Sequence, residues 1–323
     1  MKALALLSGG LDSILATKLV LDQGIEVVAL QLILPFTAEK TDYAGAVAKR
    51  FEIPIIHVEA GAEYLEIIRN PKYGYGSGMN PCIDCHSYML REAKRIAEEI
   101  GAEFIFTGDV LGERPMSQHK KALEIADREA GLEGMVLRPL SAKLLPKTIP
   151  ECEGWIDRSK LLDIKGKSRK VQIALATKFN LDYPSPAGGC LLTDKEFVSK
   201  VKDLFTHNAT VTKIDLALLK VGRHFRLASS KLIVGRNEAE NRLLSVLKRP
   251  EDYVFEVPGY GSPTTILEGS KDKEAIVLAA RLTARYSDAH AEEEVLVEYR
   301  DGKRKGRLIV PPLNSESKSV LRL

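Results

Sequence analysis

The chain has 323 residues, of which 45% are hydrophobic and 28% are charged, and its formal net charge is +3. This length is about twice that of a common domain, so we expect two domains. No apolar run reaches the roughly 20 residues that cross a bilayer, and the chain enters a strand at once, without a signal peptide. We therefore expect a cytoplasmic protein with no membrane partner.

The distribution of charge and the number of cysteines limit the classes of partner and cofactor that we expect. Residues 195–323 hold 23 Lys and Arg against 18 Asp and Glu, whereas the preceding residues carry a slight negative excess. A mildly basic C-terminal part is compatible with nucleic acid, and a solvated charged surface would explain it as well. Four cysteines are too few for a disulfide scaffold, which leaves metal ligands, redox thiols or core residues.

The first half of the chain alternates strands and helices. We predict strands over residues 4–7, 25–33, 54–58, 103–107 and 135–140, and helices over about 11–19, 39–50, 63–69, 83–100 and 116–130. Such alternation is typical of an α/β, doubly wound parallel sheet, whose ligands lie at the carboxyl ends of the strands. Residues 141–170 look irregular, and a helix over 169–179 follows.

The order of predicted strands and helices changes from about residue 205. We predict strands over 218–227, 231–234, 254–257 and 265–267, helices over 237–247 and 271–286, and a closing hairpin of 295–299 with 307–310. The hairpin turns at Asp301-Gly302, a strong turn signal. These elements predict a smaller α+β domain, 205–323, after a first domain, 1–195.

One motif joins the first strand to the first helix: Ser8-Gly9-Gly10-Leu11-Asp12-Ser13. A strand, a glycine turn and a helix N-terminus together make an anion site, because free backbone N–H groups and the helix dipole converge there. The glycines let a phosphate approach the backbone. The motif lacks the Gly-Lys-Ser/Thr of a P-loop and the G-x-G-x-x-G of a dinucleotide fold.

Three cysteines form the second group of candidates. Cys82-Ile83-Asp84-Cys85 opens a predicted helix, which places both thiols on one side of its first turn, where the dipole lowers thiol pKa values. A single C-x-x-C is compatible with zinc, iron–sulfur or redox chemistry. Cys190 follows two glycines, which let the backbone bring its sulfur close to another group. Cys152 lacks such a context, and His86 is expected to be a hydrogen-bonding or surface residue.

The loop at residues 8–13 carries the signature of the PP-loop ATP pyrophosphatases, which split ATP between its α and β phosphates. Together with Asn80-Pro81-Cys82-x-x-Cys85-His86, Thr107-Gly108-Asp109 after a strand, and the distant Gly-Gly-Cys190, residues 1–195 resemble the tRNA thiouridine synthetases of the MnmA-like and ThiI-like branches. In that family ATP adenylates a uracil carbonyl oxygen, and sulfur then displaces the leaving group.

The resemblance implies roles for residues around the nucleotide. Ser8, Gly9, Gly10, Asp12 and Ser13 would hold the leaving pyrophosphate, with Asp12 facing Mg²⁺. Gln31, Gly108 and Asp109 would lie beside ATP, with backbone groups near residues 30–32 reading the adenine. Arg114 and Gln118 are further candidates.

The resemblance also implies roles for the cysteines. Iron–sulfur members hold a [4Fe-4S] cluster with three cysteines, and its free iron carries the incoming sulfide; Cys82, Cys85 and Cys190 match this pattern. Cluster-free members instead use one cysteine as a persulfide and another to resolve it. The presence of three candidates favours the cluster, with Asp12 and these cysteines as the catalytic set.

The expected partners are tRNA and a sulfur donor. Residues 232–237 resemble the RNA-binding module of NFACT proteins, and the hairpin tip, residues 300–305, is a candidate for phosphate contact, as is a basic set of Lys143, Arg158, Lys167, Arg169 and Lys170. Two other functions remain open: an amidating PP-loop ligase with structural zinc, and an RNA-binding or sulfur-carrying protein without catalysis.

Overall fold

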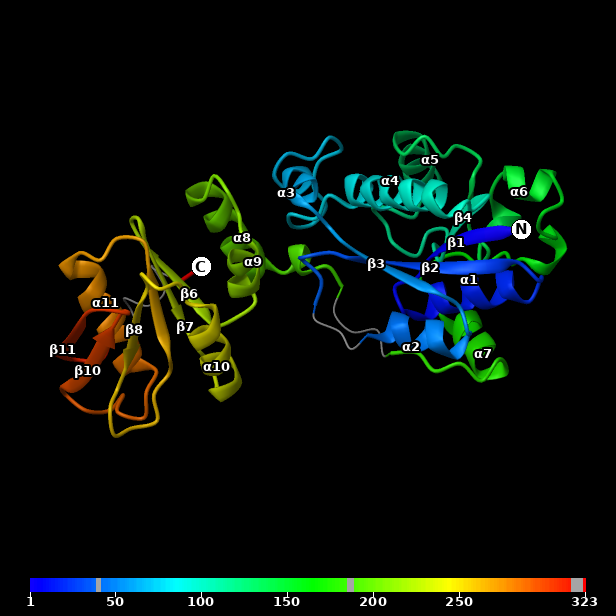
Figure 1. The fold of residues 1–323 in the computed structure, drawn as a ribbon. Coiled ribbons are helices and arrows are strands. Elements are labelled where there is room, and N and C mark those ends of the chain that lie inside the picture. Colours follow the sequence, from blue (N-terminus) through cyan, green and yellow to red (C-terminus); the bar gives the residue numbers. More distant parts are fainter. Residues whose placement is uncertain (39–41, 185–188, 315–321) are drawn as a thin grey trace. The chain divides into compact units, whose positions relative to one another are not determined.

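The computed structural model describes residues 1–38, 42–184, 189–314 and 322–323. It divides into two compact units, Met1–Thr193 and Asp194–Leu323 (Figure 1), and each unit has its own sheet and core. Among the described residues, no helix is both long and apolar enough to cross a membrane.

The first unit is built on a five-stranded parallel sheet. Its strands are β1 (Lys2–Leu6), β2 (Glu26–Ile33), β3 (Ile55–Glu59), β4 (Phe104–Thr107) and β5 (Val136–Leu137), in the order β3-β2-β1-β4-β5. From β1 the chain continues to β2 on one side, and β4 joins on the other. Because the strand order reverses there, a crevice is expected at the carboxyl ends of β1 and β4.

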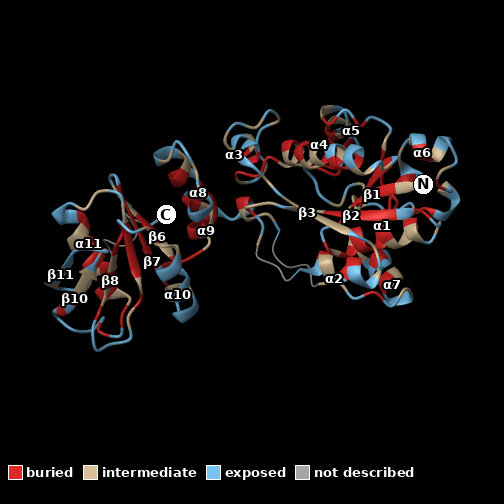
Figure 2. Cartoon of the chain, viewed as in Figure 1, coloured by how far each residue is buried: buried red, intermediate tan, exposed pale blue. Residues whose placement is uncertain are grey.

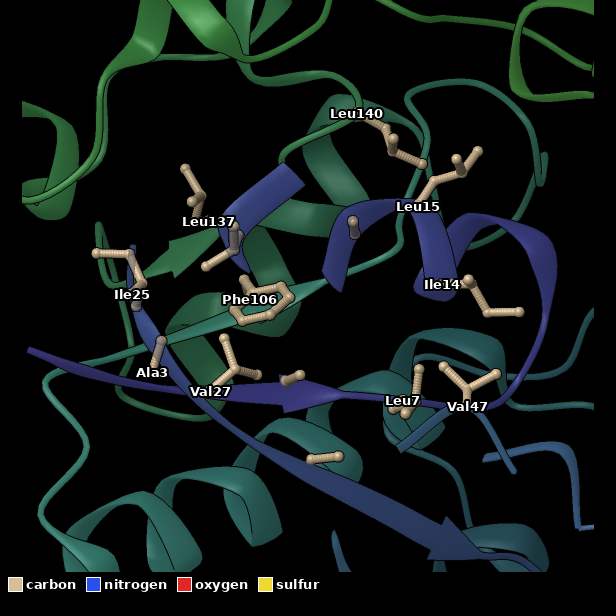
Figure 3. Packing of buried hydrophobic residues seen from close by; sticks show 14 of the residues in the cluster. Ala3, Leu7, Ile14, Leu15, Ile25, Val27, Val47, Phe106, Leu137 and Leu140 are labelled. Carbon is tan, nitrogen blue, oxygen red and sulfur yellow. The ribbon is translucent and has the colours of Figure 1, made fainter. Parts of the chain in front are cut away.

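Helices cover both faces of this sheet, as the doubly wound prediction requires. They are α1 (Leu11–Leu21), α2 (Tyr43–Arg50), α3 (Ala62–Arg69), α4 (Cys82–Ile100), α5 (Lys120–Glu129), α6 (Ile149–Cys152) and α7 (Lys170–Lys178). Side chains of α1, α2 and α7 form one core with β1, β2 and β4; Figure 3 shows Val27 near Phe106, and Val47 near Leu7. The other core lies between the opposite face and helices α4 and α5.

The second unit carries a six-stranded antiparallel sheet in the order β11-β10-β8-β9-β7-β6. Its elements are α8 (Lys195–His207), α9 (Lys213–Leu219), β6 (Arg223–Leu227), β7 (Ser230–Val234), α10 (Glu238–Leu247), β8 (Tyr253–Glu256), β9 (Thr265–Glu268), α11 (Lys273–Arg285), β10 (Val295–Arg300) and β11 (Lys305–Val310). Helix α11 packs on one face through Leu278 and Leu282. Leu218 and Leu244, from the segments of α9 and α10, pack on Ile233 and Ile266 of the other face.

Several predicted helices and strands begin or end at other residues in the structure, and one helix was not predicted. The strand predicted from residue 218 starts at Arg223, because Thr212 and Asp215 form a capping box that begins helix α9 over the leucine-rich run. Helix α8 was not predicted, although Asp194 caps it by accepting from the Phe197 N–H. The strand predicted over 135–140 is only two residues long, the helix predicted from 116 begins at Lys120, and residues 39–41 of another predicted helix lie outside the described residues.

Candidate nucleotide and cysteine site

The loop between β1 and α1 has the geometry of an anion site. Gly9 adopts a φ of +73°, and a Cβ there would lie 2.7 Å from the Ala44 nitrogen. Gly10 is the N-cap of α1 and supplies no side-chain cap to the first-turn N–H groups. These N–H groups therefore point from the helix start into the loop, where they suit a phosphate.

Both serines of the motif lie in this loop. Ser13 Oγ donates to the Gly10 carbonyl at 2.9 Å, and the Gly10 N–H donates to Ser8 Oγ at 3.3 Å. The two hydroxyl oxygens lie 3.3 Å apart. The loop therefore holds two adjacent hydroxyls beside the helix start.

Gly108 brings the end of β4 against the same loop. A Cβ at this position would lie 2.5 Å from the Ser13 nitrogen and 2.7 Å from its Cα. No side chain larger than glycine's fits without moving one segment. The segment of residues 107–109 thus lies directly beside the first turn of α1, as predicted from its place after a strand.

Asp12 makes an ion pair with Arg169, a residue 157 positions away that precedes α7. Arg169 Nη2 donates to Asp12 Oδ2 at 2.8 Å, and Arg169 Nε lies 3.5 Å from Glu113 Oε1. Burial, and then the Asp12 charge, raise the pKa of Glu113. Asp12 Oδ1 is buried and has no hydrogen-bond partner among the described residues, so it keeps an acceptor for a cation. This arrangement suits the predicted Mg²⁺.

Two other members of the basic set have different contacts. Arg158 Nη1 binds Glu151 at 2.5 Å, and Lys143 Nζ donates to the Ser159 carbonyl at 2.8 Å. These two side chains stabilise the segment around α6. Within the set, Arg169 is the residue for which the structure records a contact with the PP-loop.

Asp109 lies beside the loop but its carboxylate is used inside the protein. Thr107 Oγ1 donates to Asp109 Oδ2 at 2.8 Å, and Gln118 Nε2 donates to Oδ1 at 2.9 Å. Burial opposes its ionisation, but His86 and Arg138 hold the pKa of Asp109 below its usual range. Asp109 and Gln118 therefore position the loop after β4.

Gln31 lies on β2, two residues before the end of the strand and opposite His57 of β3. The neighbouring Leu30 carbonyl accepts from the Leu7 N–H at 2.9 Å, which ties β2 to the start of the PP-loop. This is the carboxyl edge of the sheet. A contact of Gln31 with the nucleotide stays a prediction.

The segment that carries Cys190 packs against the loop that leads to Cys82. Met79 N–H donates to the Leu192 carbonyl at 2.8 Å, and a Cβ on Gly78 would lie only 2.3 Å from that oxygen. Cys190 itself forms an antiparallel bridge with Thr37. By contrast, a Cβ on Gly189 would meet nothing within 4 Å, and residues 185–188, with the first glycine of the motif, lie outside the described residues. The close approach therefore depends on Gly78, which was not predicted.

Each of the three thiols has a hydrogen-bond partner. Asn80 Nδ2 donates to Cys82 Sγ at 3.1 Å, Tyr64 Oη lies 3.3 Å from Cys85 Sγ, and the backbone at Leu192 bonds to the Cys190 sulfur. Neither Tyr64 nor Asn80 was among the predicted site residues. Tyr64 is 21 positions from Cys85 in the chain, whereas Asn80 belongs to the motif that precedes Cys82 but was given no role.

The thiols also influence one another electrostatically. Burial raises the pKa of Cys85 to about 12; the Tyr64 hydrogen bond opposes this shift, and the charges of Cys190 and Cys82 add to it. Burial likewise raises the pKa of Cys190. The expectation that the helix dipole makes these thiols acidic is thus wrong for Cys85, because desolvation outweighs the dipole. The mutual effects place the three sulfurs in one neighbourhood.

Within the described ranges, no group of three or more His, Cys, Asp or Glu side chains is arranged to hold a metal ion. The neighbourhood offers three sulfurs, one fewer than the four protein ligands that structural zinc takes. His86 lies close enough to Asp109 to lower its pKa. Cys152 is exposed on α6.

Comparisons with known proteins find two family models that match separate parts of this chain. Residues 1–143 match the family model described as thiamine biosynthesis protein (ThiI), and residues 222–319 match the model of the NFACT protein RNA binding domain. The chain is similar to a probable tRNA sulfurtransferase from Thermococcus kodakarensis, 31% identical over 146 residues that cover 43% of this chain and 36% of that protein. It is also similar to the tRNA-specific 2-thiouridylase MnmA from Xanthobacter autotrophicus, 26% identical over 218 residues, 61% of this chain and 53% of that one.

The chain thus spans about a third to a half of the length of these curated relatives. A solved structure, U34-tRNA thiolase NcsA from Methanococcus maripaludis with its [4Fe-4S] cluster, matches with a TM-score of 0.34 at 17% identity, over 68% of this chain and 69% of that chain. Residues 1–143 are therefore similar to the ThiI family and residues 222–319 are similar to the RNA-binding domain of the NFACT family, in agreement with the PP-loop geometry of the first unit.

Proposed function

We propose that this protein is an ATP-dependent tRNA uridine sulfurtransferase that forms 2-thiouridine or 4-thiouridine. The observation that carries the proposal is the segment after β4, which borders both candidate sites. Gly108 packs on Ser13 of the PP-loop, and Asp109 faces His86, the residue after Cys85. These contacts support our inference that the nucleotide and the thiols share one crevice, which a two-step activation and sulfur transfer requires.

The first step joins tRNA to AMP. The uracil carbonyl oxygen attacks the α-phosphorus of ATP, the bond to the β-phosphate oxygen breaks, and pyrophosphate leaves. The N–H groups at the start of α1 and the Ser8 and Ser13 hydroxyls hold that pyrophosphate, and the Arg169 guanidinium neutralises its growing charge. Asp12, through its unpartnered Oδ1, would hold Mg²⁺, which supplies further neutralisation of the phosphates.

In the second step sulfur attacks the activated carbon, and AMP leaves with the former carbonyl oxygen. Cys82, Cys85 and Cys190 would hold a four-iron cluster, which supplies an open iron site for the sulfide. The number of thiols supports the cluster over a cysteine persulfide, because the persulfide route needs two cysteines and this neighbourhood offers three. Tyr64 and Asn80 orient two of the sulfurs.

Anaerobic purification tests the cofactor. We expect a brown protein with about four irons and four sulfides per chain, and Cys190→Ala should lose most of that iron. Cys152→Ala is the matched control, because this cysteine is exposed and lies outside the site. A colourless protein that carries zinc would favour the amidating ligase, and a metal-free protein that still thiolates tRNA would favour the persulfide route.

Nucleoside analysis tests the reaction. tRNA from a strain that lacks the gene should lose one thiouridine, and the wild-type gene should restore it. Asp12→Asn should fail to restore it, because the PP-loop would lack its cation ligand. If no thionucleoside disappears from the deletion strain, the proposed function is wrong.

A further inference from the structure

One part of the second unit's sheet has an open face. Helix α11 packs against one side, where Val297, Tyr299 and Leu308 of the last two strands belong to its core. On the other side, the core that includes Leu218 and Leu244 extends only to Ile233 of β7 and Ile266 of β9. Among the described residues, the outward side chains of β10 and β11 belong to neither of these two cores; Figure 2 colours both strands by the burial of their residues. Ile309 is 65% exposed and Leu296, its cross-strand partner, is 41% exposed.

This open face is strongly basic at one end. Between residues 298 and 307 the chain has five Lys and Arg against two acids. Glu298 forms an ion pair with Arg307, whose Nη2 lies 2.7 Å from Glu298 Oε1. Asp301 accepts from the N–H groups of Lys303 and Arg304 at 2.7 and 2.6 Å, so its carboxylate shapes the turn.

Three consecutive cations remain available at the tip. Lys303, Arg304 and Lys305 are all exposed, and within the described part of the chain none of their charged groups has a carboxylate partner. Most other arginines of this unit form ion pairs with carboxylates. Arg226 pairs with Asp203, and Arg249 pairs with Asp215. The hairpin tip is therefore a concentrated source of free positive charge.

The chemistry of the face indicates how it would contact RNA. Lys and Arg bind phosphates and so position nucleic acid, whereas base recognition in single strands uses exposed aromatic rings. The aromatic residue of β10, Tyr299, points into the core, where its ring stacks on Phe255 with centroids 5.3 Å apart. The outward residues of both strands are charged or aliphatic.

We propose that the β10–β11 hairpin is the RNA-contacting surface of the second unit, and that it binds the phosphate backbone of a folded RNA with little dependence on base sequence. The identity of that RNA as tRNA rests on the proposed function. The surface itself rests on the open face, the free cations and the match of this unit to an RNA-binding domain.

The test measures binding of the full chain to an unmodified tRNA transcript by fluorescence anisotropy across a salt series. K303Q/R304Q/K305Q should weaken binding by about 10-fold or more at ~0.1 M salt, and should reduce the slope of log K against log salt by about two. K195Q/K202Q/K220Q removes the same charge from α8 and the end of α9. It should leave binding within about twofold of the wild type, and circular dichroism checks that both variants are folded.

Three results would overturn the proposal. These are wild-type affinity in the hairpin variant, an equal loss in the α8–α9 variant, or a strong preference of the wild type for tRNA over an RNA duplex of unrelated sequence and similar length. Failure of the proposed function gives a different result: the wild type binds tRNA, the hairpin variant loses that binding, and no thionucleoside forms.

Discussion

Gly78 permits a close contact between the loop before Cys82 and the segment that carries Cys190, and replacing it with alanine perturbs this contact. The new Cβ would lie 2.3 Å from the Leu192 carbonyl oxygen and 3.3 Å from the Thr193 Cα. That oxygen accepts from the Met79 N–H at 2.8 Å, and Leu192 is fully buried. The two segments cannot make room for the methyl group and keep this hydrogen bond.

The expected cost follows from these contacts. Overpacking of a tight site destabilises by about 1–3 kcal/mol, and the lost hydrogen bond adds roughly 1 kcal/mol. We expect Gly78→Ala to lower the free energy of unfolding of the first unit by about 2–4 kcal/mol. Because Cys190 lies two residues before Leu192, the variant should also separate Cys190 from Cys82 and hold less iron.

Urea unfolding monitored by fluorescence gives the measurement, because the chain has a single tryptophan, Trp155, packed against the core of the first unit. Gly189→Ala is the matched control: it lies next to Cys190, and its Cβ would meet nothing within 4 Å. We expect it within about 0.5 kcal/mol of the wild type. A Gly78→Ala protein with wild-type stability and iron content would refute the reasoning, as would an equal loss in Gly189→Ala.

Three other substitutions test separate parts of the structure. Gly108→Ala places a Cβ 2.5 Å from the Ser13 nitrogen, so ATP affinity measured by calorimetry should fall at least about 10-fold; unchanged affinity would contradict the packing of β4 on the PP-loop. Tyr64→Phe removes the hydroxyl beside Cys85, so a chelator should extract iron roughly 10-fold faster, and an equal rate would show that this hydrogen bond is unimportant. Burial raises the pKa of Asp252 to about 6, above the unfolded value near 3.9, so the folded wild type loses stability as the pH rises through this interval. Calorimetry of the second unit should therefore show Asp252→Asn to be more stable than the wild type by up to about 3 kcal/mol at pH 7.5 and by little at pH 4. An equal difference in stability at both pH values would contradict this prediction.

Local sequence predicted most of the first unit's architecture. The strand, glycine turn and helix at residues 2–21 follow from apolar spacing and two glycines, because that information lies within one short stretch. The alternation of strands and helices then predicted the parallel sheet. Prediction was poorer where the same apolar residues are compatible with a strand or a helix. The leucine-rich segment before Arg223 was expected to be a strand, but a capping box at Thr212 begins a helix there.

Long-range contacts account for what was missed at the candidate site. Arg169 was one of five basic residues with no feature to separate it from the others, and its distinction is an ion pair with Asp12 across 157 positions. Tyr64 lies in an ordinary amphipathic helix, and only the packing of α3 near α4 brings its hydroxyl to Cys85. Asp109 was expected beside ATP; its carboxylate accepts hydrogen bonds from Thr107 and Gln118, and its contact with the nucleotide stays a prediction.

From the sequence by itself we predicted the chemistry of this protein: a PP-loop for phosphate, three cysteines for sulfur or a cluster, and a basic hairpin for RNA. Residue type and local spacing decide these features, because they depend on neighbours in the chain. Only the tertiary structure decided which atoms meet, that Gly78 and not Gly189 permits the approach of Cys190, and that burial makes Cys85 a weak acid. Such outcomes depend on space and desolvation, which are properties of the folded molecule.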